Sequence, residues 1–112
     1  MDRKHRAVRE ASLLLGLPPT AQLLLLVLVK EGRELPISHL LKKTKRSERA
    51  LRQHLGHLVR MGLLRKRMGR TEKRRKVCFY SLDLIQFLKG VGRILEEKRE
   101  RLERILKECS GV

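Results

Sequence analysis

The sequence predicts a mainly α-helical protein with one small β-hairpin and a long C-terminal helix. Three observations lead to this prediction. Apolar residues recur at helical spacing over most of the 112 residues. Two short segments with strand-forming residues, within 63–82, flank a loop of basic residues. A stripe with heptad spacing then runs through eight positions, with Lys98 as its one polar interruption: Leu84, Leu88, Val91, Leu95, Lys98, Leu102, Ile105 and Cys109.

The N-terminal part contains two predicted helices. The first covers residues 2–15 and ends at a glycine. The second begins near Pro19, because proline suits the first position of a helix. Its segment 23–29 is apolar on every side, which is typical of a buried central helix. Residues 35–37 then form a short extended segment, which Pro36 keeps at the edge of a sheet.

Two further helices and the hairpin follow. Ser38 is expected to cap a short helix over 38–43, and Ser47 is expected to cap a helix from 48 to about 61. A polar turn, 44–46, separates them. The hairpin strands are expected at 63–68 and 76–82, with the loop 69–75 between them.

The C-terminal helix carries the heptad pattern. Asp83 is expected to cap it, and its polar face alternates acidic and basic residues. The chain therefore divides into residues 1–82 and a dimerisation helix, 83–112. The first half of this helix is expected to pack on its own domain and the second half on a second copy; the alternative is that it folds back on its own chain. The predicted dimer residues are Val91, Leu95, Lys98, Leu102, Ile105 and Cys109. The pattern leaves a parallel or antiparallel orientation open.

The charge of the chain indicates a polyanionic partner. The net charge is +16 and the pI is about 11.1. The segment from Lys42 to Lys76 contains 15 Lys and Arg residues and only two acids, Glu48 and Glu72, so its net charge is +13. Nucleic acid is the first candidate partner, and an anionic membrane surface is the second.

The order helix, turn, helix, basic hairpin is that of a winged helix-turn-helix. The segments 37–41 (ISHLL) and 53–64 (QHLGHLVRMGLL) resemble the winged-helix regulators of the arsenic-repressor and multiple-antibiotic-resistance-repressor superfamily. The resemblance covers residues 18–82, and the long last helix is similar to that of small archaeal members that dimerise through it. It implies a homodimeric transcription regulator that binds double-stranded DNA.

The helix 47–61 is the predicted recognition helix. Arg makes two hydrogen bonds to guanine and Gln makes two to adenine in the major groove. Arg49, Arg52 and Gln53 are therefore the candidates for reading bases, while Glu48 would accept from cytosine and Ser47 opens the helix. The alternative is an ordinary solvated helix face.

Phosphate contacts are expected from the basic segment 65–76, the predicted wing. Its charge is too dense for an ordinary turn, because like charges repel unless phosphates neutralise them. The candidates in the wing are Arg67, Arg70, Lys73, Arg74, Arg75 and Lys76. The others are Lys42 and Lys43 at the end of the helix 38–43, and Lys45 and Arg46 in the turn that follows it.

Three alternatives to a sequence-selective regulator remain. A chromatin-type protein would use the same basic surface to coat DNA with low specificity. RNA binding is less favoured, since aromatics for stacking make up only 3% of the chain. A ligand-gated repressor would need an effector pocket at the dimer interface, and the sequence does not identify an effector.

Catalysis, metals and cofactors are not expected. No nucleophile-base pattern, carboxylate pair or glycine-rich phosphate loop occurs. His54 and His57 lack further ligands nearby, and the segment 38–42 lacks the paired cysteines of the family's metal sensors. Cys78 is interpreted as a small core residue, with a redox switch as the alternative.

The sequence also indicates where the protein acts. Two cysteines favour a reducing compartment. The apolar run 23–29 is too short to span a membrane, and Gly16 and Pro18 interrupt a possible signal peptide. A cytoplasmic, nucleoid-associated protein is expected. The absence of Asn beside abundant Lys, Arg and Glu is typical of thermophilic proteins.

Overall fold

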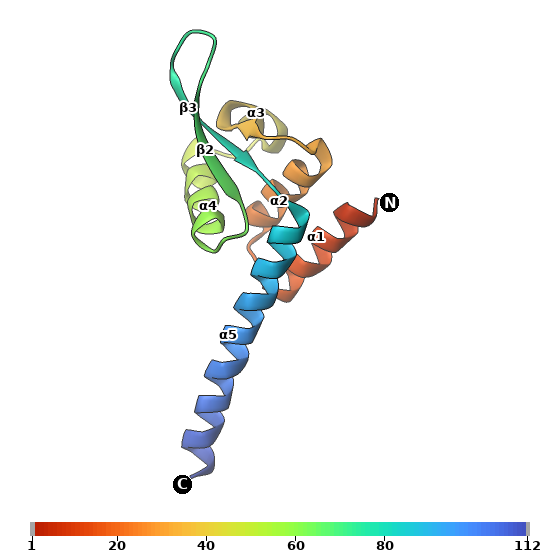
Figure 1. Cartoon of the computed structure of the whole chain (residues 1–112), viewed down its shortest axis with the longest axis vertical. Coiled ribbons are helices and arrows are strands. Elements are labelled where there is room, and N and C mark those ends of the chain that lie inside the picture. The colour runs from red at the N-terminus through yellow and green to blue at the C-terminus, as the bar shows by residue number, and fades with distance from the viewer. Residues whose placement is uncertain (1, 112) are drawn as a thin grey trace.

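The computed structural model describes residues 2–111, which form five α-helices and one three-stranded antiparallel sheet. Figure 1 shows a helical body, a hairpin that projects from one end and a long helix that leaves the other. The elements in chain order are α1 (Arg3–Leu14), α2 (Pro19–Glu31), β1 (Leu35–Pro36), α3 (Ile37–Thr44), α4 (Glu48–Arg60), β2 (Arg65–Arg70), β3 (Lys76–Ser81) and α5 (Leu84–Ser110). The predicted fold class, mainly α with a small hairpin, is confirmed.

The apolar helix α2 forms the centre of the core. Leu24, Leu25 and Leu28 are fully buried, and α2 packs against α1, α3 and α4. On α4, Leu51, Leu55 and Leu58 are buried. The spacing of these three residues places them on one face, so the remaining faces of α4 are free for polar side chains.

The sheet has the order β1-β3-β2, with β1 as a short edge strand that contains Pro36. The sequence predicts that the first hairpin strand begins at Leu63, but β2 begins at Arg65. Leu63 and Leu64 are instead buried in the core directly after α4. There the Leu63 amide donates to the Leu58 carbonyl, and Gly62 has a φ of 75°. The strand also continues through Arg70, so that only residues 71–75 form the loop.

Two of the three predicted helix caps are confirmed. The side chain of Ser47 accepts from the Ala50 amide, and that of Asp83 accepts from the Ile85 and Gln86 amides. The prediction for Ser38 is wrong. Helix α3 begins one residue earlier, with Pro36 at the N-cap position and no side-chain cap.

The first third of α5 belongs to the core of the body. Phe87 is fully buried and Val91 is 4% exposed, whereas Leu88 of the predicted heptad pattern is 38% exposed. Gly90 allows this packing, because a Cβ atom there would lie 3.2 Å from the Gly62 carbonyl oxygen. The core therefore extends past residue 82, and the assignment of Val91 to a dimer interface is wrong: it is covered by its own chain.

Candidate nucleic-acid interface

The turn between α3 and α4 exposes two of the predicted basic residues. Lys45 has a φ of 56° and ends α3, and its amide donates to the Leu41 carbonyl. The Thr44 hydroxyl donates to the Leu40 carbonyl and accepts a 3.4 Å hydrogen bond from the Arg46 amide. These bonds fix the backbone of the turn, while the side chains of Lys45 and Arg46 remain exposed.

Helix α4 presents a polar face to solvent. Arg49, Arg52 and Gln53 are exposed, opposite the buried leucines of the same helix. The Arg52 guanidinium donates to the Glu48 carboxylate across 3.2 Å, one turn earlier. In the free protein Arg52 is therefore paired with Glu48 through its Nη2 atom.

The structure separates the three base-reading candidates by position on α4. Gln53 lines a small hollow with residues of the α1–α2 connection, including Leu17 and Pro18. Arg52 lies on the opposite flank, toward β2 and β3, together with Gly56. Arg49 lines neither hollow, and the 100° helical step places it between these two flanks.

The wing is the hairpin formed by β2, β3 and the loop 71–75. Its loop is held by the Thr71 amide donating to the Arg75 carbonyl and the Arg74 amide donating to the Thr71 carbonyl. Arg74 has a φ of 60°. The hairpin projects beyond the body (Figure 1), and its basic side chains are exposed; these are Arg70, Lys73, Arg74, Arg75 and Lys76.

Arg67 differs from the other basic residues of the wing. Its Nε and Nη2 atoms donate to the two carboxylate oxygens of Glu34 at 2.9 and 2.6 Å, and its guanidinium lies 4.8 Å from the centre of the Phe79 ring. The hydrogen bond from Arg67 lowers the pKa of Glu34 and raises that of Arg67 itself. Arg67 therefore anchors the wing to the segment before β1, and its predicted phosphate contact would compete with Glu34.

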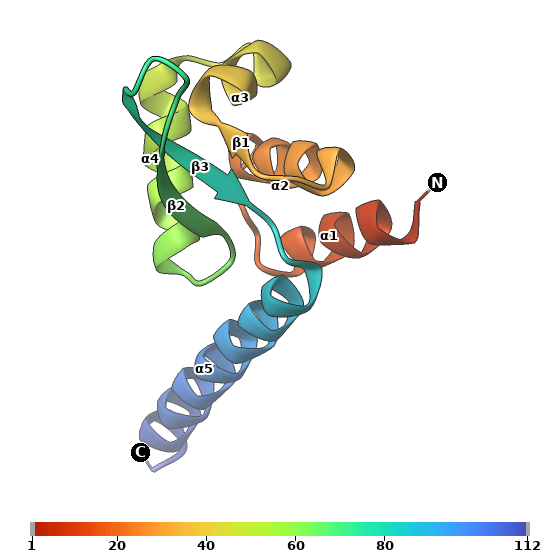
Figure 2. The same ribbon diagram turned by 45° about the horizontal axis from the view of Figure 1, so that its top comes forward.

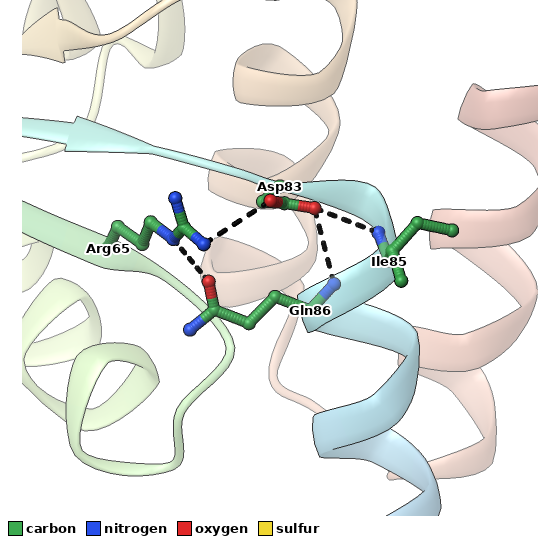
Figure 3. Close-up of polar contacts among 4 residues, drawn as sticks. All are labelled: Arg65, Asp83, Ile85 and Gln86. Atoms are coloured by element: carbon green, nitrogen blue, oxygen red, sulfur yellow. Dashed lines mark hydrogen bonds and ion pairs between the residues drawn. The ribbon is translucent and has the colours of Figure 1, made fainter.

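A second polar cluster connects the wing to α5 (Figure 3). The Arg65 guanidinium pairs with the Asp83 carboxylate at 3.4 Å and donates to the Gln86 side chain. Asp83 also accepts from the amides of Ile85 and Gln86, at 3.1 and 3.3 Å. One carboxylate thus caps α5 and holds the first residue of β2. The sequence predicts the cap but not this connection.

The other singled-out residues have ordinary surroundings. Among residues 2–111 no group of three His, Cys, Asp or Glu side chains is placed to hold a metal. Cys78 is half-buried against the core, with its Sγ atom 3.2 Å from the Met68 sulfur. None of the helices in this range is long and apolar enough to cross a membrane.

The predicted dimer residues divide between buried and exposed positions. Leu95 packs partly against the core. Lys98, Leu102, Ile105 and Cys109 are exposed on the half of α5 that extends from the body. Leu106, which the heptad pattern omits, is also exposed at 58%, beside Leu102 at 57% and Ile105 at 55%.

Solved structures share this fold across nearly the whole chain. A possible transcriptional regulator from Methanosarcina mazei superposes with a TM-score of 0.70 and 18% identity, covering 92% of this chain and 85% of the other. The YusO protein from Bacillus subtilis gives a TM-score of 0.54 and 18% identity over 98% of this chain and 86% of its own. A disulfide-formed AbfR gives 0.56 and 16% over 97% and 83%.

Sequence comparison adds no family assignment, since neither a protein-family model nor a curated protein matches the chain. The structural similarity nevertheless agrees with the element order found here: a helix-turn-helix, α3 and α4, followed by a wing and a long last helix. The chain has the winged helix-turn-helix fold.

Proposed function

We propose that the protein is a transcription regulator that binds double-stranded DNA as a homodimer in the cytoplasm. The observation that carries the proposal is the shared orientation of two basic surfaces. Helix α4 and the wing lie side by side (Figure 2), and the exposed cations Arg52 of α4 and Lys66 of β2 line the same hollow. A helix fits the major groove, while an adjacent hairpin reaches the flanking backbone.

The proposal gives different tasks to the two surfaces. Arg49 and Gln53 read base edges, since both are exposed and, within residues 2–111, Arg49 forms no ion pair. Arg52 is a weaker candidate for a base contact, because its guanidinium is paired with Glu48. The predicted phosphate contacts are the exposed residues of the turn and the wing tip, namely Lys42, Lys43, Lys45, Arg46, Arg70, Lys73, Arg74, Arg75 and Lys76.

A second copy of the chain is the proposed partner of α5. Residues 96–110 are exposed throughout, and a helix of this length alone in water is marginally stable. Leu102, Ile105 and Leu106 give it an apolar stripe, and acidic and basic residues alternate around that stripe. This is the composition of a self-associating coiled coil. A two-fold dimer would present two α4 helices to successive major grooves.

The first test is selection from a random-sequence duplex library at about 150 mM salt, where non-specific phosphate binding is weakened. A dimeric regulator is expected to enrich a palindromic motif whose half-sites lie about one helical turn apart. Retention of DNA without an enriched motif would refute base reading. Absence of binding to any duplex would refute the proposal as a whole.

Low-specificity coating of DNA is the second candidate function. The observation that favours it is the size of the charge, +16 on 112 residues, which exceeds what one recognition helix and one wing need. A coating protein would bind random duplexes as tightly as any selected sequence. The selection experiment therefore separates the two candidates directly.

The double substitution Arg49→Ala with Gln53→Ala is expected to reduce selectivity. Each lost pair of hydrogen bonds to a base removes about 1–3 kcal/mol of discrimination. The ratio of affinities for the selected motif and for random DNA should fall at least about tenfold, measured by competition binding. The control, Arg9→Ala, removes one exposed arginine from α1. Equal loss on both DNAs would contradict the assignment of α4 as the recognition helix.

A further inference from the structure

A hollow between α4 and the wing collects cationic side chains, and two of them, Arg60 and Lys66, are not assigned to any task by the sequence analysis. It has a volume of about 300 Å³ and is lined by Arg52, Gly56, Val59, Arg60, Lys66 and Tyr80. Three of the six residues are cations and none is an acid. Arg60 and Lys66 come from different elements, the end of α4 and the second position of β2.

The packing around the hollow keeps these cations together. Gly56 has no side chain, and the Arg60 guanidinium lies over it: a Cβ atom at Gly56 would be 3.4 Å from the Arg60 Nη1 atom. Lys66 stands directly across the ladder from Tyr80, which is only 5% exposed. Tyr80 is therefore nearly buried, whereas the cations that line the hollow are exposed.

The hollow lacks any negative charge of its own. Burial raises the pKa of Tyr80, so its hydroxyl stays protonated and neutral at physiological pH. Glu48 pairs with Arg52 but does not line the hollow. Like charges gathered around a small hollow repel one another unless an anion joins them. The planar guanidinium of Arg and the compact ammonium of Lys both donate hydrogen bonds to phosphate oxygens.

We propose that this hollow binds one phosphate group, held by Arg60, Lys66 and Arg52. Its position between the recognition helix and the wing is where one strand of the DNA backbone would pass if α4 occupied the major groove. In this form the inference rests on the proposed function. The same chemistry would accept a free phosphate ion, and the two sources are distinguished by experiment.

The first arm of the test measures how duplex binding depends on salt. Each neutralised phosphate contributes about 0.9 to the slope of log affinity against log salt. The variant Arg60→Gln with Lys66→Gln is expected to reduce the slope by about 0.9 per protomer, equally on selected and random DNA. Lys89→Gln, an exposed cation outside the hollow, serves as the control and should change the slope less.

The second arm uses Tyr80 as a probe, because it is the only tyrosine and the chain has no tryptophan. Inorganic phosphate, added at constant ionic strength, is expected to change tyrosine emission of the wild type and to saturate. The double variant should lose this response, and Lys89→Gln should keep it. Glu48→Gln frees Arg52 and should tighten phosphate binding, a gain that misfolding cannot produce.

The outcomes identify the source of the phosphate or overturn the site. A loss of salt slope assigns the hollow to the DNA backbone, and a tyrosine response without loss of slope assigns it to a free ion. If the double variant matches Lys89→Gln in both arms, the phosphate site is refuted. If the wild type binds no duplex, the proposed function fails, and the tyrosine arm still decides whether the hollow binds phosphate.

Discussion

Replacing Leu102 with Glu is expected to convert the proposed dimer to a monomer. Leu102 is 57% exposed at the middle of the distal half of α5, between Lys98 and Ile105 on the apolar stripe. Burying a leucine side chain contributes about 1.5–3 kcal/mol, and symmetry repeats the loss in the second copy. The dimer dissociation constant should therefore rise at least about 100-fold, measured by analytical ultracentrifugation.

The same variant is expected to weaken DNA binding without unfolding the winged-helix body. The body's core contains Phe87 and Val91 of α5 but nothing beyond Leu95. Arg104→Gln is the matched control, since it also changes the charge by one unit but lies on the opposite side of α5 from Leu102. A Leu102→Glu protein that stays dimeric at low micromolar concentration would remove the distal half of α5 from the interface.

Local signals in the sequence are sufficient for most of the fold. Ser47 and Asp83 each stand one residue before a helix and satisfy its first free amides, so the starts of α4 and α5 follow from capping chemistry alone. Pro19 marks the start of α2 in a different way, because proline lacks the amide hydrogen that would stay unpaired at the first helical position. Ser38 fails as a cap because Ile37 already lies in α3, directly after the short edge strand.

The rotation of α5 shows where periodicity is insufficient. A heptad pattern predicts Leu88 inside, but the helix turns Phe87 and Gly90 toward the body instead. This rotation brings Gly90 close to the Gly62 carbonyl and the Leu63 side chain, where a Cβ atom would leave little room. Contacts between segments distant along the chain are invisible to spacing arguments.

In the candidate site, too, local spacing predicts some features, whereas contacts between distant segments are not predicted. The exposure of Arg49 and Gln53 follows from the spacing of the buried leucines on α4. The pairing of Arg67 with Glu34 does not, because 33 residues separate them. The spacing also does not predict that Arg60 and Lys66 line the same hollow. Each of these contacts depends on how the wing packs, which the sequence leaves unspecified.

Neutralising the wing is expected to have the largest effect on affinity. In the triple variant Arg70→Gln, Lys73→Gln and Arg75→Gln, each protomer loses three exposed cations, and a dimer loses six. Arg74 is retained because its backbone has a positive φ. If all six contact phosphates, the salt slope falls by about 5 and affinity at 150 mM salt falls by about 10³-fold or more. Fluorescence anisotropy on a labelled duplex measures both quantities.

The control for the wing asks whether position or total charge matters. Arg3→Gln, Lys4→Gln and Lys30→Gln also remove three exposed cations, from α1 and α2. Both triple variants have the same net charge, so long-range attraction to DNA is reduced equally. A wing that contacts phosphates directly makes the first variant far weaker than the second, on selected and random DNA alike. Equal losses in the two variants would mean that the whole surface attracts DNA, which is the behaviour of a coating protein and not of a wing docked on the backbone.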